Sequence, residues 1–199
     1  MTRVVKFLRR SSRDNAAALD EQAMDLIKGL APAEGPAPDV EAVAQAVLRK
    51  LNILQGRDKK MKMLRSIGRL DSAWACAVLF ELLSDPSEDT RDAAVRELAH
   101  RDDCPCGKLY ERLKRPPWYV KSSILRILCL RKDAAAVDAI KGVIEDPNVE
   151  VRRWAALALG RIGGEEARAL LLRLAKDKNV YVKQAATDAL DKLCEFKFS

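Results

Sequence analysis

Apolar side chains recur at the spacing of one helical face in five segments of this chain. Each segment begins at a basic residue, and the positions three, four and seven residues later are mostly apolar. In the segment that begins at Arg152, these positions are Ala155, Ala156 and Leu159. Because a helix turns once in about 3.6 residues, such positions share one face and predict an amphipathic helix with that face buried.

The five segments are copies of one repeat. The basic residues that begin them are Lys60, Arg91, Lys121, Arg152 and Lys183, at intervals of 30 or 31 residues. A period of this length is typical of helical solenoids. Further helical segments lie between the copies, for example residues 133–144 and 165–175. We therefore predict an all-α solenoid of about five helix pairs, each with a first helix A and a second helix B that begins at the basic motif.

Turn-forming residues mark the ends of the predicted B helices. Asp146 and Pro147 have the residue types of a helix N-cap and of a first helical position. Gly160 falls late in the same helix, and Gly163 and Gly164 provide a stop. These signals place one B helix between residues 147 and 162.

The most complete copy, residues 146–163, reads Asp-Pro-Asn-Val-Glu-Val-Arg-Arg-Trp-Ala-Ala-Leu-Ala-Leu-Gly-Arg-Ile-Gly. It resembles the HEAT repeat, in the short bacterial form also called the PBS-lyase HEAT-like repeat. The resemblance covers roughly residues 39–195 and implies a right-handed superhelix. It also implies that Asp146 and Arg152, with their counterparts in other copies, form a structural ladder between repeats. It implies little about function, since the family includes scaffolds, chromophore lyases and a DNA glycosylase branch.

The first 38 residues stand outside the repeats. Residues 1–13 carry five basic and no acidic side chains, which predicts a basic, flexible tail. Residues 14–38 predict an N-terminal helix and a proline-rich linker, so that the repeat domain comprises residues 39–199. The formal net charge is +7. Because most of this charge lies in the tail, the repeats themselves are close to neutral.

A second stripe of the B helices is predicted to line the concave surface of the stack. It consists of positions one, five and nine residues after each basic residue, and its arginines are Arg65, Arg96, Arg126, Arg153 and Arg161. Aromatic residues close to this stripe are Trp118, Tyr119, Trp154 and Tyr181. Guanidinium groups donate in pairs to carboxylate or phosphate, and aromatic rings offer flat contact area. The stripe therefore predicts a partner-binding groove, with a solvated helix face as the alternative.

The third copy departs from the repeat at residues 112–126. Arg115 stands where other copies have an aspartate, and several basic residues surround it with Glu111 as the nearby acid. Trp118 follows in the same stretch. We interpret residues 112–126 as the contact site. The alternative is a degenerate repeat in which Trp118 packs in the core.

Catalytic and metal-binding chemistry is weakly represented. The chain has one histidine and no glycine-rich phosphate loop, so neither a His-based triad nor a nucleotide fingerprint is expected. His100, Cys104 and Cys106 are the one cluster of metal-ligating residue types, and a structural zinc site needs a further ligand pair. We therefore expect a tight turn there, no cofactor and no enzymatic activity.

The cysteines and the apolar runs bear on the compartment. Five cysteines are present, and three of them lie in apolar helical segments, as small hydrophobic residues do in a reducing environment. No apolar run approaches the length of a membrane span. These features predict reduced cysteines, no transmembrane helix and a cytoplasmic location.

The leading functional hypothesis is a non-enzymatic scaffold or adaptor that binds an acidic or amphipathic protein segment. One alternative is nucleic-acid backbone binding along the row of Arg65, Arg96, Arg126 and Arg161. Another, which rests on the resemblance alone, is a bilin lyase or chaperone-like protein. Phe196 and Phe198 at the C-terminal end either fold over the end of the stack or form a surface for self-association or for a partner.

Overall fold

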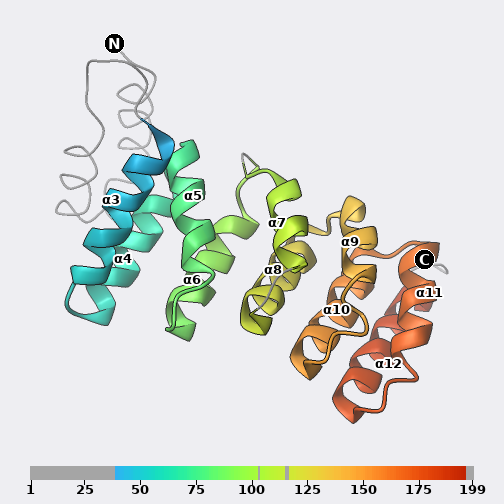
Figure 1. Ribbon diagram of the computed structural model, residues 1–199. Helices are drawn as coiled ribbons and strands as arrows, with labels where there is room; N and C mark the ends of the chain where they lie inside the picture. The colour runs from blue at the N-terminus through green and yellow to red at the C-terminus, as the bar shows by residue number, and fades with distance from the viewer. Residues whose placement is uncertain (1–38, 103, 115–116, 196–199) are drawn as a thin grey trace. The chain divides into compact units, whose positions relative to one another are not determined.

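The structure is a computed structural model that describes residues 39–102, 104–114 and 117–195. These residues form ten α-helices and one short 3-10 helix, with no strand among them (Figure 1). The predicted all-α fold is therefore confirmed. The predicted basic tail, N-terminal helix and linker, and the two C-terminal phenylalanines, lie outside the described residues.

Contacts divide the chain into two compact units, Met1–Leu98 and Ala99–Ser199. The helices of the first unit are α3 (Val40–Ile53), α4 (Arg57–Gly68), α5 (Ala73–Leu82) and α6 (Glu88–Ala99), the last of which ends at the boundary. Those of the second are α7 (Cys106–Leu113), α8 (Trp118–Arg131), the 3-10 helix η1 (Ala134–Ala136), α9 (Val137–Lys141), α10 (Val149–Ile162), α11 (Glu165–Leu174) and α12 (Val180–Glu195).

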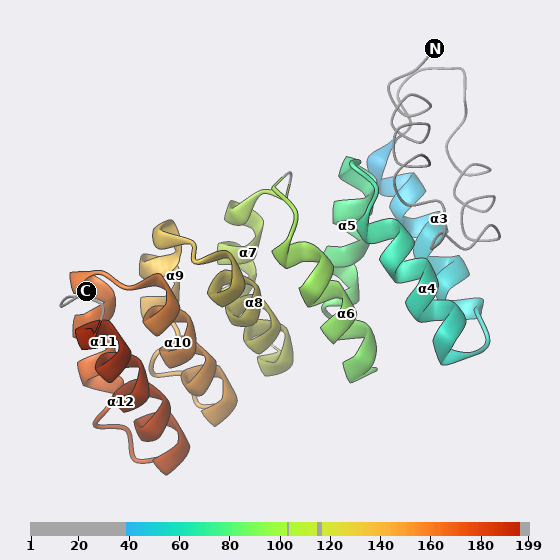
Figure 2. The ribbon, with the colours of Figure 1, turned by 180° about the vertical axis from the view of Figure 1, so that it is seen from behind.

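The helices alternate between the two predicted kinds. Each even-numbered helix contains one of the five basic residues and is a B helix, and the odd-numbered helices are the A helices. In the second unit, α10 packs against both α8 and α12, while α9 packs against both α7 and α11 (Figure 2). A and B helices therefore form two layers in which each repeat stacks on the next, as in an α-solenoid. In the first unit, α5 packs against both α3 and α4.

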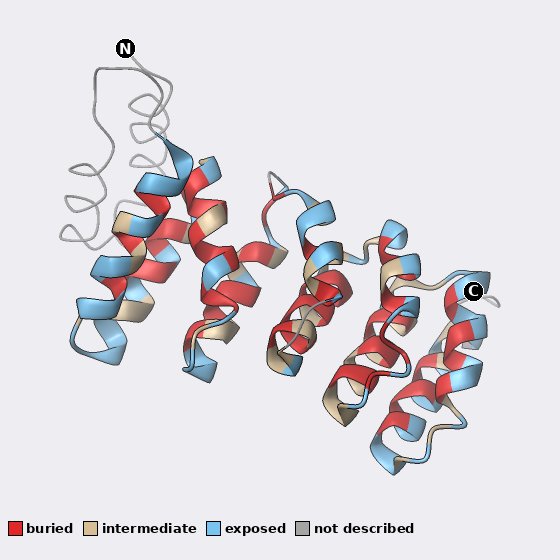
Figure 3. Ribbon diagram, viewed as in Figure 1, coloured by how far each residue is buried: buried red, intermediate tan, exposed pale blue. Residues whose placement is uncertain are grey.

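The predicted core stripe is buried. Ala155, Ala156 and Leu159 of α10 have no exposed surface, and the same is true of Ile124 and Leu125 of α8. Figure 3 shows buried positions along the facing sides of the paired helices. Because burying one leucine or isoleucine side chain contributes about 1.5–3 kcal/mol, this stripe supplies the main attraction between successive B helices.

The predicted start of the B helix at residue 147 is wrong by two residues. Helix α10 begins at Val149 rather than at Pro147, because Asn148 is its N-cap and accepts a hydrogen bond from the amide of Glu150 at 2.9 Å. The carboxylate of Asp146 accepts from the amide of Asn148 at 2.9 Å and so shapes the preceding turn. This turn leaves the second oxygen of Asp146 available to a neighbouring repeat.

The A helix predicted over residues 133–144 is interrupted. Asp133 accepts a hydrogen bond from the amide of Ala135, and this Asx turn leads into the 3-10 helix η1. The α-helix that follows, α9, has only five residues and ends at Gly142. Aspartate and glycine both have low helix propensity in helix interiors, so the regular α-helix is confined to the middle of the predicted segment.

The basic residues of the B helices join successive repeats. Arg152 donates from Nε and Nη2 to the two carboxylate oxygens of Asp177 at 2.7 and 3.1 Å. Its Nη1 donates to the carbonyls of Asp146 and Pro147 at 2.8 and 3.2 Å. One guanidinium therefore holds the loop of its own repeat and the carboxylate of the next, in a pair that is less than a tenth exposed.

The same link recurs along the chain with lysine in place of arginine. Lys60 pairs with Asp85 at 2.9 Å, and Lys121 pairs with Asp146 at 2.7 Å. The ladder implied by the HEAT resemblance is thus made between each basic residue and the aspartate 25 residues later. Arg91 has no such acid, because the residue 25 positions later is Pro116, and Arg115 precedes it.

Gly160 lies inside α10 and permits a close approach to α12. A Cβ atom at this position would lie 2.5 Å from the Cβ of Ala189. The predicted role of Gly163 as a helix stop holds, since it is the C-cap of α10 with φ of 75°. Gly160 itself is therefore a packing residue rather than part of the stop signal.

Gly160→Ala is expected to lower the free energy of unfolding by about 1–3 kcal/mol, because the new methyl group overlaps Ala189. This loss outweighs the helix-propensity gain of about 1 kcal/mol from replacing glycine. Urea denaturation followed by circular dichroism measures the change. Adding Ala189→Gly should return part of the lost stability, and a single variant as stable as the parent would contradict the close approach.

Candidate functional site

Two guanidinium groups approach the ring of Trp154 in the second unit. The Cζ atom of Arg126, from α8, lies 5.3 Å from the ring centroid, and that of Arg153, from α10, lies 5.4 Å from it. Both distances are in the range of cation–π attraction. Arg153 also pairs with Glu150 at 3.1 Å. The structure thus brings together three of the predicted site residues, and Glu150 offsets the charge of Arg153.

Trp118 and Tyr119 form an aromatic pair in the first turn of α8. Their ring centroids lie 5.9 Å apart with the planes at 83°, an edge-to-face arrangement. Trp118 is 48% exposed, so the alternative in which it packs in the core is wrong. Trp118, Ser122 and Arg126 follow one another at intervals of four residues and share one stripe of α8. Because α8 packs against α10, this stripe and Trp154 belong to neighbouring B helices.

Ser122 lies in the middle of that stripe with its hydroxyl buried and without a hydrogen-bond partner in the described structure. No feature of the sequence distinguishes it from other helical serines. Ser66 of α4, by contrast, donates to the carbonyl of Lys62 at 3.2 Å. An unsatisfied hydroxyl costs stability, because it has left water without replacing the hydrogen bonds lost there.

Ser122→Ala is expected to leave the free energy of unfolding unchanged or to raise it by up to about 1 kcal/mol, because it removes an unsatisfied polar atom from a buried position. Urea denaturation provides the measurement. A loss of more than about 1 kcal/mol would show that the hydroxyl has a partner in solution.

Two other predicted site residues of the second unit, Arg161 and Tyr181, are not part of the Trp154 cluster. Arg161 is exposed and lies close to the thiol of Cys129, whose pKa burial raises and Arg161 partly lowers. Tyr181, at the start of α12, is 69% exposed. Neither residue has a ring contact with Trp154 in the described structure.

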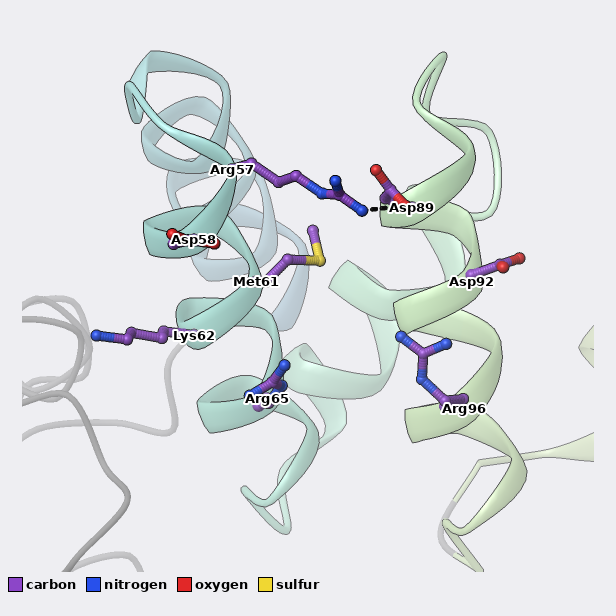
Figure 4. A pocket seen from close by; sticks show the side chains of 8 residues that line it. All are labelled: Arg57, Asp58, Met61, Lys62, Arg65, Asp89, Asp92 and Arg96. Atoms are coloured by element: carbon purple, nitrogen blue, oxygen red, sulfur yellow. Dashed lines mark hydrogen bonds and ion pairs between the residues drawn. The ribbon is translucent and has the colours of Figure 1, made fainter.

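Arg65 and Arg96 lie in the first unit, where they line a hollow of about 400 Å³ between α4 and α6. The residues that line it are Arg57, Asp58, Met61, Lys62, Arg65, Asp89, Asp92 and Arg96 (Figure 4). Positions one and five of the predicted stripe contribute four of these. Arg57 and Asp89 form an ion pair at 2.8 Å across the hollow. They were not predicted as site residues, because they precede the stripe on their helices.

Residues 107–191 match the family model for HEAT repeats. This segment consists of HEAT repeats. It contains the Trp154 cluster and both helical layers of the second unit. That the HEAT repeats are of the short PBS-lyase type stays a prediction. No curated protein matches the chain.

Two of the solved structures that are similar to this chain are an engineered and a designed protein. One is an engineered protein that is 20% identical, with 98% of each chain covered and a TM-score of 0.46. Another is a designed armadillo repeat protein in complex with the peptide (KR)4, which is 16% identical, with 96% of this chain and all of that chain covered and a TM-score of 0.46.

The state of the cysteines differs from expectation. Cys106, Cys129 and Cys194 are free, but Cys76 and Cys104 are disulfide-bonded, so the prediction of five reduced cysteines is wrong. The sulfur of Cys106 accepts a hydrogen bond from Arg131 at 3.2 Å. Among the residues that the structure describes, no group of three metal-ligating side chains comes together, at His100, Cys104 and Cys106 or elsewhere.

Tyr110 and Cys129 have pKa values above their usual range because of the side chains packed around them. Burial, and then the hydrogen bond that it donates to Asp133, raise the pKa of Tyr110 above its usual range. Burial likewise raises the pKa of the Cys129 thiol. Both groups therefore stay protonated at neutral pH, and neither is set up as a nucleophile or a base. In the described part of the chain, no helix is both long and apolar enough to span a bilayer.

Proposed function

We propose that this chain is a non-enzymatic binding module whose second unit holds an acidic or amphipathic segment of another protein. The observation that carries the proposal is the cluster of Arg126, Arg153 and Trp154, in which two guanidinium groups and an indole ring come together on neighbouring B helices. The cluster lies within residues 107–191, which match the family model for HEAT repeats.

Arg126, on the same stripe of α8 as the exposed Trp118, is the group that recognises a carboxylate. Arg126 and Arg153 both have interactions within the chain, but a guanidinium has five donors and can engage a second group. The guanidinium of Arg126 lies against Trp154, which restricts its motion and so reduces the entropy lost on binding. A carboxylate of the partner accepts two hydrogen bonds from this planar donor.

Trp118 and Trp154 recognise the apolar side chains of the partner. Trp118 is half exposed and lies two helical turns before Arg126, a separation of about 12 Å along α8. An extended peptide covers this distance in about four residues. The site therefore fits an extended segment in which an acidic and an apolar side chain lie three or four residues apart.

Fluorescence anisotropy with labelled ten-residue peptides tests the proposal. A peptide of alternating Glu and Leu is expected to bind, and one of alternating Lys and Leu is expected not to bind. Arg126→Gln should weaken binding about tenfold, since it removes a hydrogen-bonded charge pair. Arg168→Gln, which removes an exposed arginine of α11, is the matched control. Equal binding of the two peptides, or equal loss in the two variants, would contradict the site.

The nucleic-acid alternative predicts a different response to salt. If the arginines contacted Z phosphates of duplex DNA, the logarithm of affinity would fall against that of salt with a slope of about −0.9Z. Glu150 and Asp89 interleave with the arginines and weaken a continuous phosphate track. A flat salt dependence with a DNA duplex would reject this alternative. No described residue adds support to the bilin-lyase alternative.

A further inference from the structure

Leu130, near the C-terminal end of α8, is an apolar side chain that remains 49% exposed. It lies one helical turn after Arg126, and residues four apart are neighbours on a helix surface. We propose that Leu130 and Leu157 form a second apolar contact of the peptide site, which takes an apolar side chain two residues away from the acidic one. The inference rests on the proposed function and adds to it the spacing of the recognised segment.

The surface that α8 leaves accessible is narrow. Among residues 120–130, only Lys121, Arg126 and Leu130 are not buried. Lys121 is engaged by Asp146 at 2.7 Å. From its N-terminal to its C-terminal end, the helix therefore presents the apolar ring of Trp118, the guanidinium of Arg126 and the apolar side chain of Leu130. This order is complementary to a segment that has an acidic residue between two apolar ones.

Leu157 brings α10 into the same contact. Its carbonyl accepts a hydrogen bond from the thiol of Cys129 at 3.7 Å, so it lies beside the residue that precedes Leu130. The guanidinium of Arg161, one turn later on α10, also lies close to that thiol. Leu157 is partly exposed and follows Trp154 by three residues, so both lie on one face of α10. The two leucines therefore extend the Trp154 cluster toward the C-terminal ends of α8 and α10.

The charged side chains around the two leucines favour an apolar group of the partner there. Arg131 donates to the sulfur of Cys106 at 3.2 Å and is engaged by its own repeat. Asp188, at the matching position of α12, accepts from Gln184 at 2.7 Å. Arg161 is exposed at the edge and disfavours a basic side chain. An apolar side chain needs no counter-charge and gains from covering the leucines.

The spacing of the recognised segment follows from the positions along α8. Leu130 lies about 6 Å beyond Arg126 along the helix axis, and Trp118 lies about 12 Å before it. An extended chain rises about 3.3 Å per residue, so these distances correspond to about two and four residues. Even spacings place all three side chains on one face of an extended segment. The acidic residue of the partner therefore has one apolar residue four positions away on one side and another two positions away on the other.

Fluorescence anisotropy with labelled ten-residue peptides tests this spacing. On a serine background, Leu stands four residues before Glu and a second Leu stands two residues after it. A second peptide has the reverse order, because an extended segment can run in either direction. In the tighter order, replacing the second Leu by Ala or by Glu should weaken binding about fivefold, since an apolar side chain is lost from the contact. Equal affinity of the Leu and Ala peptides, or binding of the Glu peptide as tight as that of the Leu peptide, would overturn the proposal.

Matched variants assign the effect to Leu130. Leu130→Ala should weaken binding of the Leu peptide about fivefold and leave that of the Ala peptide unchanged. Leu172→Ala is the control, because Leu172 of α11 is also 49% exposed. Equal affinity in the two variants would also overturn the second contact.

Arg126→Gln separates this proposal from the proposed function. If the peptides bind in a way that depends on Arg126 but not on Leu130, the peptide site stands and the second apolar contact is wrong. Binding that depends on neither residue, or no binding by any peptide, would reject both.

Discussion

Arg152→Ala is expected to lower the free energy of unfolding by about 3–5 kcal/mol, the largest stability effect of any substitution considered for this chain. The guanidinium makes four hydrogen bonds, two to the carboxylate of Asp177 and two to carbonyls of its own loop. Its side chain is 6% exposed and that of Asp177 is 9% exposed. Removing Arg152 therefore leaves a buried carboxylate without its cation and two carbonyls without their donor.

The neighbouring arginine is the control for this experiment. Arg153 pairs with Glu150, but its side chain is 35% exposed, so Arg153→Ala should cost at most about 1 kcal/mol. Urea denaturation of the two variants gives the comparison. Similar losses in both variants would mean that the repeat-to-repeat link does not act as the structure indicates.

The same ion pair predicts a loss of stability in acid. The hydrogen bond from Arg152 lowers the pKa of Asp177 below its ordinary value of 3.8. A carboxyl with a lowered pKa in the folded state stabilises the fold fully above the unfolded pKa, and this contribution is lost as the pH falls through the folded pKa. The free energy of unfolding should therefore decline below about pH 4. Asp177→Asn should make this part of the decline disappear, and an unchanged pH dependence in that variant would contradict the assignment.

Trp154→Ala is expected to weaken binding of the Glu-Leu peptide by about 30-fold or more, equivalent to about 2 kcal/mol. In the proposed site the indole ring contacts the partner, and the guanidinium groups of Arg126 and Arg153 lie against it. Its removal therefore affects both the apolar and the charged part of recognition. Fluorescence anisotropy with the labelled peptide measures the loss.

Two controls separate this effect from general damage. Trp154→Phe keeps an aromatic face and should retain part of the affinity. Leu172→Ala truncates an exposed apolar side chain of α11 and should leave binding unchanged. Affinity of Trp154→Ala within about threefold of the parent would contradict the role of the ring.

The repeat architecture can be predicted from the sequence, because the positions that are apolar in every repeat are also the positions that the fold buries. A basic residue followed by apolar positions three, four and seven residues later identifies each B helix, and these positions are buried in α8 and α10. Counting from the basic residue in the same way places Arg126 and Arg153 on one stripe with Trp154 nearby. In the structure both guanidinium groups lie against the Trp154 ring. Helical geometry alone carries this part of the site.

Other features depend on contacts between residues far apart in sequence, which the pattern does not encode. The ion pair of Arg57 and Asp89 joins two repeats outside the stripe. The need for Gly160 comes from Ala189 of the next B helix. Ser122 looks like any helical serine until the packing around it is known. The interrupted helix at residues 133–144 shows the other limit, because local side-chain hydrogen bonds there override the apolar spacing.

Fluorine NMR of the protein labelled with fluorotryptophan tests the central claim, that Trp154 and its arginines form the binding site. The three tryptophans give separate signals that single Trp→Phe variants assign. Addition of the Glu-Leu peptide should shift the Trp154 signal in a saturable way and leave that of Trp74, which is buried in the first unit, in place. Arg126→Gln should displace this titration to higher peptide concentration. A Trp154 signal that does not respond while the peptide binds would contradict the account.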